Sequence, residues 1–322
     1  MTFCVPLTPA ASGAGPSDAA SIGGKARSLI RLAQAGLPVP PAFAISAEVY
    51  RLLRRTGPRL PTQIAEAGDL SALENARAAL LAAPFPGGFS EELAANLRRI
   101  DETITDDSDA RFSVRSSFAS EDDPAALAAG LFQSRVNVSQ NAVEGAIRTV
   151  LASALTPAAF VYTQRHQTDV DAAGVAVVVH PFVAGAAAGS AAWDPNGAAP
   201  PTIEGLPATT PGAATLRAAI EVAVRRLAQQ HGAVEIEWVA TTKDTIVYLQ
   251  LRPFKPPASA PAAPSWPGWA ALGAGQWRWD SAHNPLPLSP AQSELIRIVD
   301  DRCQIGLRQK VASGYLFYES AA

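Results

Sequence analysis

Two runs of sequence decide the fold: Val234-Glu235-Ile236-Glu237-Trp238 and, after a short turn, Tyr248-Leu249-Gln250-Leu251-Arg252-Pro253. Apolar and polar residues alternate in both runs, which is the pattern of strands with one buried and one polar face. In the first strand the apolar face holds Ile236, Trp238 and Ala240; in the second it holds Val247, Leu249 and Leu251. The two runs therefore predict a hairpin over one hydrophobic core.

The polar faces of the two predicted strands carry charged groups that meet across the hairpin. A turn at Lys243-Asp244 pairs Glu237 with Gln250 and Glu235 with Arg252. Two carboxylates, an amide and a guanidinium then crowd one face, which is costly unless they hold something charged, such as a metal with phosphate. A solvated face with a cross-strand ion pair explains the same residues equally well, because exposed pairs are common and contribute little.

Composition excludes several classes of function. The 322 residues include 26 Lys plus Arg and 29 Asp plus Glu, a net charge of −3. The sequence has no basic stripe, so neither a nucleic acid nor an anionic membrane is expected as the main partner. Cys4 and Cys303 stand far apart, so neither a disulfide framework nor a thiolate metal site is indicated. No signal peptide and no apolar run of about 20 residues is present, and we expect a cytoplasmic protein.

Periodicity and turn residues predict the remaining elements. Residues 1–20 read as a loose start, and Gly23-Gly24-Lys25 opens a helix that ends near Gly36. Further helices are expected over 47–55, 71–82, 90–103, 141–154, 157–165, 213–230 and 290–311. Further strands are expected over 43–45, 111–114, 175–182 and 315–318, the second running into a polar loop, 115–123. Residues 255–267 form a Pro/Ala-rich linker, and 268–322 read as the start of a downstream segment.

Two further motifs carry charge suited to phosphate. Gly23-Gly24-Lys25 at a helix start offers backbone N–H groups and a lysine to an anion. More often, such a sequence is only a Gly-rich turn before a helix, without a ligand. It is not a Walker A loop, because the required spacing is absent. Arg115, with Ser116 and Ser117 beside it, can grip phosphate with two hydrogen bonds. Pairing of Arg115 with Glu121-Asp122 across the loop is the alternative.

The histidines give no catalytic signal. The chain has His166, His180, His231 and His283, none of them in metal-ligand spacing and none with a Ser or Cys partner that suggests a triad. His180 follows an apolar strand, where a structural histidine is expected. His283 lies in a turn-prone loop and is the histidine for which a catalytic role is hardest to dismiss.

Taken in order, these motifs resemble the nucleotide-binding domain of the pyruvate-phosphate dikinase and phosphoenolpyruvate synthase family. The resemblance rests on four blocks spread over residues 21–253. They are Ser21-Ile22-Gly23-Gly24-Lys25 with Gly36-Leu37-Pro38-Val39-Pro40-Pro41-Ala42-Phe43, Val114-Arg115-Ser116-Ser117 with Glu121-Asp122 and Val136-Asn137-Val138, Glu235-Ile236-Glu237-Trp238, and Leu249-Gln250-Leu251-Arg252-Pro253.

The resemblance implies an α+β ATP-grasp fold in residues 1–254. Two subdomains, roughly 1–170 and 171–254, would clamp ATP between their sheets. Roles carry over only to matching positions. Lys25 and Arg115 are similar to phosphate-binding residues, Arg252 to a phosphate-side cation and Glu235 to a ribose or nucleotide contact. Glu237 and Gln250 are similar to the Mg²⁺-ATP positions. Arg115 and Arg252 would act as the catalytic cations.

The sequence also departs from the family pattern. Only about forty residues separate Pro195 from Glu235, where the family has a longer stretch with a Gly-Leu-Gly-Glu element, and only Ile203-Glu204-Gly205-Leu206 is faintly similar to it. The family's phosphorylatable histidine lies in a Gly-Gly-x-x-Ser-His sequence that this chain lacks. The resemblance therefore implies an ATP-dependent phosphotransferase, similar to pyruvate, water dikinase, that passes phosphate to a histidine carrier on another chain. The final acceptor cannot be read from these residues.

Two other functions stay open. A non-catalytic or truncated nucleotide-binding module is favoured by the shortened 194–234 region and opposed by the retention of Lys25, Arg115, Glu237, Gln250 and Arg252. A carboxylate–amine ligase of the ATP-grasp type is disfavoured, because the motifs resemble those of the dikinases.

Overall fold

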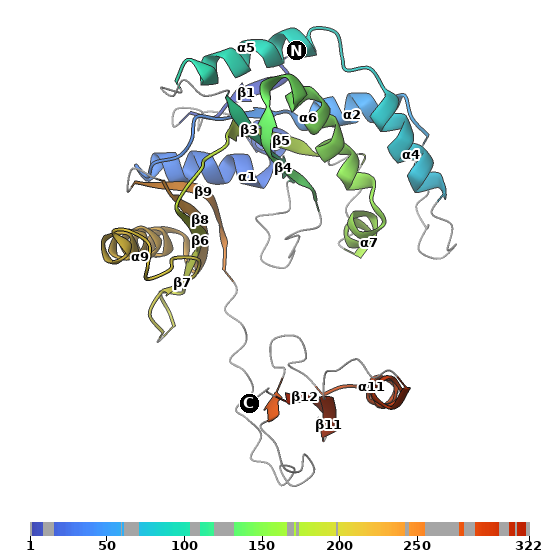
Figure 1. Cartoon of the computed structure of the whole chain (residues 1–322). Coiled ribbons are helices and arrows are strands. Elements are labelled where there is room, and N and C mark those ends of the chain that lie inside the picture. Colours follow the sequence, from blue (N-terminus) through green and yellow to red (C-terminus); the bar gives the residue numbers. More distant parts are fainter. Residues whose placement is uncertain are drawn as a thin grey trace. The chain divides into compact units, whose positions relative to one another are not determined.

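The computed structural model describes residues 2–8, 16–58, 60, 71–103, 110–118, 132–165, 171, 174–197, 199–241, 245–254, 277–279, 287–302, 309–312 and 314–319. The chain divides into two compact units, Met1–Phe254 and Lys255–Ala322. Helices and antiparallel sheets are mixed in both units (Figure 1), which confirms the predicted α+β class.

The first sheet of unit Met1–Phe254 has five strands. In spatial order they are β1 (Cys4–Pro6), β2 (Phe43–Ile45), β5 (Ala176–Pro181), β3 (Arg111–Ser117) and β4 (Ser134–Ser139), and every neighbouring pair is antiparallel. The central strand β5 is apolar and buried, as its run of valines predicts. Because β5 pairs with β2 and β3, the first sheet extends beyond residue 170, where we expected the subdomains to divide.

Helices pack on one face of the first sheet. They are α2 (Ala47–Arg55), α4 (Ser71–Ala82), α5 (Phe89–Asp101), α6 (Val143–Ala152), α7 (Pro157–Arg165) and the 3₁₀ turns η3 (Gln140–Ala142) and η4 (Ser153–Leu155). The predicted spans 47–55, 71–82 and 157–165 are confirmed at both ends. Phe112 and Val114 of β3 and Val177 and Val179 of β5 face these helices in the first core.

The second sheet carries the hairpin quoted first. Its order is β7 (Thr202–Ile203), β6 (Ala187–Trp193), β8 (Val234–Ala240) and β9 (Ile246–Pro253), again all antiparallel. Helix α9 (Ala213–His231) covers one face of this sheet (Figure 1). Leu216 and Ile220 of the helix and Ile236 and Trp238 of β8 belong to one buried cluster. The opposite face is left for polar side chains.

Helix α1 (Pro16–Gln34) joins the two sheets. Its apolar residues Ala26, Leu29 and Ile30 belong to the same buried cluster as Ala44 and Val178 of the first sheet and the apolar face of the second. These residues have i, i+3, i+4 spacing, so one apolar face of the helix packs against both sheets. The helix is kinked at Gly23, where the backbone is not helical.

The structure corrects several predicted boundaries. The start of the chain is not wholly loose, because β1 pairs with β2 and the Glu92 carboxylate accepts the N–H groups of Phe3 and Cys4. Strand β3 continues to Ser117, where a loop was expected, because Ser116 and Ser117 pair with β5. Strands β4 and β6 were not predicted as elements.

The unit Lys255–Ala322 has a three-stranded sheet of its own. It contains β10 (Trp277–Trp279), β12 (Tyr315–Glu319) and β11 (Gln309–Ala312), in that order, with helix α11 (Pro290–Arg302) preceding β11. The helix expected over 290–311 is wrong at its end, since residues 309–311 pair with β12. The linker 255–267 lies outside the described residues.

Within the described part of the chain, no single helix is long and apolar enough to cross a membrane. One pair bent by 56°, Gln140–Leu155 with Pro157–Thr163, passes the same test of length and composition.

Cys4 is buried, and burial, with the nearby Glu92 carboxylate, raises the pKa of its thiol to about 12.

Candidate functional site

The hairpin of β8 and β9 has the predicted register at its polar end. Glu237 lies opposite Gln250, and Glu235 lies opposite Arg252. Residues that face each other across a ladder share a face of the sheet, so these four side chains lie on the side away from α9. This confirms the pairing expected from the alternation. The turn itself, Lys243-Asp244, lies outside the described residues.

A β-bulge in β9 changes the apolar face of the hairpin. The register shifts just before Trp238, which lies opposite Tyr248 and leaves Leu249 as the extra residue. Ile246 and Tyr248 are therefore buried in the core, whereas Val247 and Leu249 are only half-buried. The prediction that Val247 and Leu249 form the buried face was wrong, because strict alternation carries no sign of an inserted residue.

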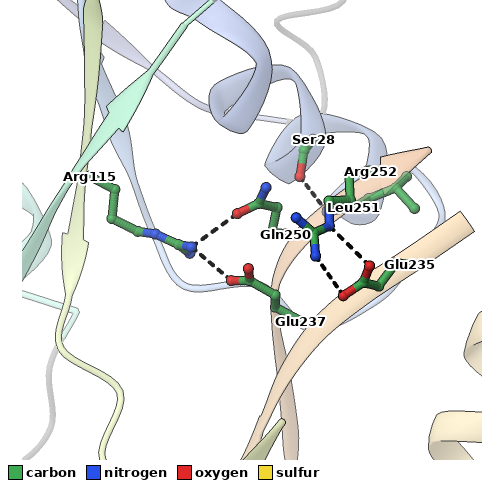
Figure 2. A network of polar contacts seen from close by, with 7 residues as sticks. All are labelled: Ser28, Arg115, Glu235, Glu237, Gln250, Leu251 and Arg252. Atoms are coloured by element: carbon green, nitrogen blue, oxygen red, sulfur yellow. Dashed lines mark hydrogen bonds and ion pairs between the residues drawn. The ribbon is translucent and has the colours of Figure 1, made fainter. Parts of the chain in front are cut away.

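Arg115 reaches from the first sheet to the polar face of the second (Figure 2). Its Nη2 donates to Glu237 Oε2 at 2.7 Å and to Gln250 Oε1 at 3.0 Å. The side chain of Arg115 is 15% exposed and that of Glu237 is 35% exposed, while Gln250 is buried. Hydrogen bonds to charged groups are short and strong when water is partly excluded. The contact brings three predicted site residues from β3, β8 and β9 to one point.

Arg252 forms a second ion pair, within the hairpin. Its Nε donates to Glu235 Oε2 at 3.1 Å, and its Nη2 donates to Glu235 Oε1 at 2.7 Å (Figure 2). This forked geometry fixes both side chains on the polar face. The same ion pair is expected if this face is simply solvated and holds no ligand. Both arginines that were expected to meet phosphate, Arg115 and Arg252, are therefore engaged by carboxylates in this structure.

The Gly23-Gly24-Lys25 turn packs directly on the end of β3. Gly23 has a φ of 75°, and a Cβ added there would lie 2.0 Å from the carbonyl oxygen of Ser117. Any side chain would collide with backbone, so the motif requires glycine for a close approach. The N–H of Gly24 donates to the Phe118 carbonyl at 3.0 Å. The turn and the arginine-bearing strand are thus one packed unit.

Ser117 connects this turn to Arg115. The Ser117 hydroxyl accepts from the N–H of Ala26 at 3.2 Å and donates to the Ile22 carbonyl at 2.8 Å. Ser117 lies two residues beyond Arg115 and on the same face of β3. Lys25, which directly precedes Ala26, is half-buried at this junction. The structure therefore brings the Gly-Gly-Lys turn next to the strand that carries Arg115.

The two serines of the Arg115-Ser116-Ser117 motif point to opposite faces. Ser116 pairs with Val177 and turns toward the helical core, where its buried Oγ has no hydrogen-bond partner among the described residues. It does not lie with Arg115, although we expected two hydroxyls beside the arginine. The proposed pairing of Arg115 with Glu121-Asp122 falls outside the described residues.

His180 lies near Arg115 but is buried. It sits on β5 opposite Ser113, and its Nδ1 lies 2.7 Å from the Pro181 carbonyl. A carbonyl only accepts, so Nδ1 carries the proton and Nε2 does not. Burial, and to a smaller degree the positive charge of Arg115, lowers the pKa of His180 to about 4. His180 is neutral, consistent with the expected structural role. His166 and His283 fall outside the described residues.

Two hydroxyls at the site were not identified from the sequence. Ser28 of α1 accepts the N–H of Leu251 at 2.6 Å (Figure 2). Ser190 of β6 lies opposite Glu237 and so shares its row on the polar face. Single serines in Ala-rich sequence give no periodic signal, and only the pairing of distant strands could have revealed them.

The shortened region after Pro195 contributes to the second sheet. Ile203 of β7 pairs with β6, and the N–H of Glu204 donates to the Ser190 carbonyl at 2.9 Å. A Cβ at Gly189 would lie 2.0 Å from the Glu204 carbonyl oxygen, so the two segments pack without side chains between them. The Ile203-Glu204-Gly205-Leu206 element thus lies beside the strand next to Glu237.

The oxygens of Glu237 and Gln250 fit a hard cation. One guanidinium nitrogen of Arg115 contacts both, so the two oxygens converge on a position that already holds positive charge. Carboxylate and amide oxygens are ligands that Mg²⁺ accepts, with the remaining positions taken by phosphate and water. Among the described residues no group of three or more His, Cys, Asp or Glu could hold a metal. The protein would therefore supply only part of a coordination shell.

A known protein family matches more than half of the chain. Residues 19–195 match the family described as "Pyruvate phosphate dikinase, AMP/ATP-binding domain". The matched range includes the Gly-Gly-Lys turn and Arg115 and ends before the β8–β9 hairpin. The hairpin roles therefore rest on the resemblance and on the geometry above.

Two curated proteins are similar over half of the chain. A phosphoenolpyruvate synthase of Aeropyrum pernix is 30% identical over 179 residues, 52% of this chain and 22% of that protein. A probable phosphoenolpyruvate synthase of Methanocaldococcus jannaschii is 32% identical over 174 residues, 50% of this chain and 14% of that protein. The chain thus matches less than a quarter of the length of either relative.

Solved structures resemble the chain weakly. A D-alanine–D-alanine ligase from Coxiella burnetii has a TM-score of 0.33 at 12% identity, covering 68% of this chain and 44% of that one. The D-cycloserine synthetase DcsG has a TM-score of 0.32 at 14% identity, covering 75% of this chain and 65% of that one.

Proposed function

Since the chain belongs to the pyruvate phosphate dikinase AMP/ATP-binding domain family, we propose that it binds Mg²⁺-ATP between its two sheets and begins phosphoryl transfer from it. The observation that carries this proposal is the convergence of Arg115, Glu237 and Gln250 from the two sheets on one point. The two antiparallel sheets, with polar groups between them, agree with the expected ATP-grasp fold.

The residues would divide the work by charge. Lys25, on the turn packed against β3, and Arg115 would bind the phosphates, where N–H groups and positive charge stabilise an anion. Arg252 would add positive charge from the hairpin, and Glu235 would contact the ribose or another part of the nucleotide. Glu237 and Gln250 would hold Mg²⁺, which neutralises phosphate charge. Such a site lowers the barrier to phosphoryl transfer by positioning and electrostatics.

Titration calorimetry with Mg²⁺-ATP tests this proposal. We expect the wild-type chain to bind, and Lys25→Ala or Glu237→Ala to weaken binding by roughly tenfold or more, since a lost charged hydrogen bond costs about 1.5–3 kcal/mol. Glu221→Ala is the matched control, because Glu221 pairs with Arg225 on the exposed side of α9. No heat from the wild type would contradict nucleotide binding, and an unchanged Glu237→Ala affinity would remove the metal role.

We propose further that the phosphoryl group passes to a histidine on a separate protein, as in a phosphoenolpyruvate synthase-like dikinase. The proposal is supported by the similarity to phosphoenolpyruvate synthases. AMP formation by the chain alone should be negligible and should appear when a histidine-domain protein is added. Clear AMP release without it would contradict a separate carrier.

The second candidate is a nucleotide-binding module without catalysis. The short segment between Pro195 and Glu235 favours it. Binding of Mg²⁺-ATP, with no AMP formed in the presence of histidine-domain proteins encoded next to this chain, would support the module over the enzyme.

A further inference from the structure

We propose that Arg115 occupies the cation position of Glu237 and Gln250 when no nucleotide is bound, and that a divalent metal and Arg115 exchange there as ATP binds. This inference rests on the proposed function and adds a mode of regulation to the same site. It predicts that the metal competes with a side chain of the protein itself, and that the phosphates relieve the competition.

The geometry makes the two occupants mutually exclusive. The same Nη2 of Arg115 donates to Glu237 at 2.7 Å and to Gln250 at 3.0 Å. A divalent cation bound to both oxygens would take the space that this nitrogen fills. Two positive charges at contact distance also repel each other strongly where water is partly excluded. Metal binding therefore requires the guanidinium to leave.

The fold lets the guanidinium move while its backbone stays in place. Arg115 lies in the middle of β3, which pairs with β5 on one side and β4 on the other. Ser117, two residues on, is held by the Gly-Gly-Lys turn. The strand cannot shift easily, so exchange takes place by rotation of the long side chain. The turn that carries Lys25 is hydrogen-bonded to Ser117, at the end of β3 and two residues from Arg115. Phosphates bound at this turn would therefore offer Arg115 a new partner.

The exchange couples metal and nucleotide binding. Metal alone must displace Arg115 and leave it without its carboxylate. Nucleotide alone draws Arg115 away and leaves Glu237 without a cation. When both bind, every charge has a partner, so each should raise the affinity for the other, and by thermodynamic linkage by the same factor. Arg252 provides a contrast, because its carboxylate partner is Glu235 and not a predicted metal ligand.

Mn²⁺ titrations followed by electron paramagnetic resonance of the free ion test the exchange. Without nucleotide, Arg115→Met should bind Mn²⁺ about tenfold more tightly than the wild type, because a charged hydrogen bond no longer has to be broken. Arg252→Met removes the same charge from the same face without freeing the position between Glu237 and Gln250, and should raise the Mn²⁺ affinity much less than Arg115→Met does. A non-hydrolysable ATP analogue should raise the Mn²⁺ affinity of the wild type more than that of Arg115→Met.

Equal or weaker Mn²⁺ binding by Arg115→Met would overturn the exchange. So would an equal gain in Arg252→Met, which would reduce the effect to net charge. Arg115→Gln gives the same comparison if the methionine variant does not fold, as judged by circular dichroism. The nucleotide-free titrations do not depend on ATP binding. Failure of the wild type to bind the analogue would therefore reject the proposed function, whereas loss of the Arg115→Met gain alone would reject only the exchange.

Discussion

At the scale of single residues, chemistry and orientation have different origins. Arg115, Glu237 and Gln250 were selected from the sequence because a guanidinium, a carboxylate and an amide suit phosphate and a hard metal. Ser116 was grouped with Arg115 for its hydroxyl, yet it faces the opposite core, since neighbouring residues on a strand point to opposite sides. Residue type indicated the chemistry, and the strand decided which side chains can take part.

His180 should make stability depend on pH. Its pKa is lowered to about 4 in the folded chain and is about 6.5 when unfolded. Between these values the unfolded state binds the extra proton, so the free energy of unfolding falls as the pH drops from about 6.5 to about 4, by about 3 kcal/mol at most. Urea unfolding of His180→Gln across this range should show a flatter pH dependence than the wild type.

The partly exposed His231 is the control for this measurement. Its pKa is lowered by modest burial and by Arg31, so His231→Gln should remove much less of the slope. A His180→Gln profile parallel to that of the wild type would show that His180 is not held neutral.

At the scale of elements, α1 protects an edge. Strand β9 is the last strand of the second sheet and would expose unpaired N–H groups. The N–H of Leu251 donates instead to Ser28 of α1, and that of Tyr248 donates to the Pro38 carbonyl just after the helix. The periodicity of the sequence predicts the helix, but it does not predict that the helix accepts a hydrogen bond from the edge strand β9. This hydrogen bond ties the strand of Gln250 to the element that carries Lys25.

Ser28→Ala should therefore destabilise the fold and weaken nucleotide binding together. The change leaves the buried N–H of Leu251 without an acceptor, which costs about 1–3 kcal/mol. Thermal unfolding and calorimetry with Mg²⁺-ATP measure the two effects. Ser139→Ala is the control, since the Ser139 hydroxyl donates to Asn141 Oδ1 in an exposed hydrogen bond, and it should behave like the wild type. Unchanged stability in Ser28→Ala would show that α1 does not hold the edge of β9.

At the scale of the whole molecule, every residue assigned to the candidate site lies in the unit Met1–Phe254. Its two cores are separate clusters, and Ala44 and Val178 on the site side of the first sheet belong to the cluster of the second. The sheets are thus linked by shared packing around α1 as well as by Arg115.

A chain that ends at Phe254 should fold cooperatively and bind Mg²⁺-ATP with the affinity of the full chain, because it keeps both sheets and their shared core. Chemical unfolding and calorimetry on the shortened chain check this. A large loss of affinity with cooperative unfolding retained would place part of the site in the unit Lys255–Ala322.

The sequence by itself determined the helices, several strands and the pairing at the polar end of the hairpin. Period-two alternation, with a turn at Lys243-Asp244, predicts Glu237 opposite Gln250, and apolar spacing in helices is strong enough to give α2, α4 and α7 their bounds. These features follow from interactions between residues close in the chain. The order of the motifs also indicated the family.

Only the tertiary structure decided where distant segments meet. The hydrogen bond between Ser28 and Leu251 and the bond from Arg115 to Glu237 join residues far apart in sequence, and local patterns contain no record of them. The bulge at Leu249 lies within the hairpin, but strict alternation gives no sign of an inserted residue. The engagement of Arg115 by the proposed metal ligands is the clearest case. The sequence predicts Arg115, Glu237 and Gln250 for the same site. Only the approach of the two sheets shows that Arg115 is hydrogen-bonded to the other two.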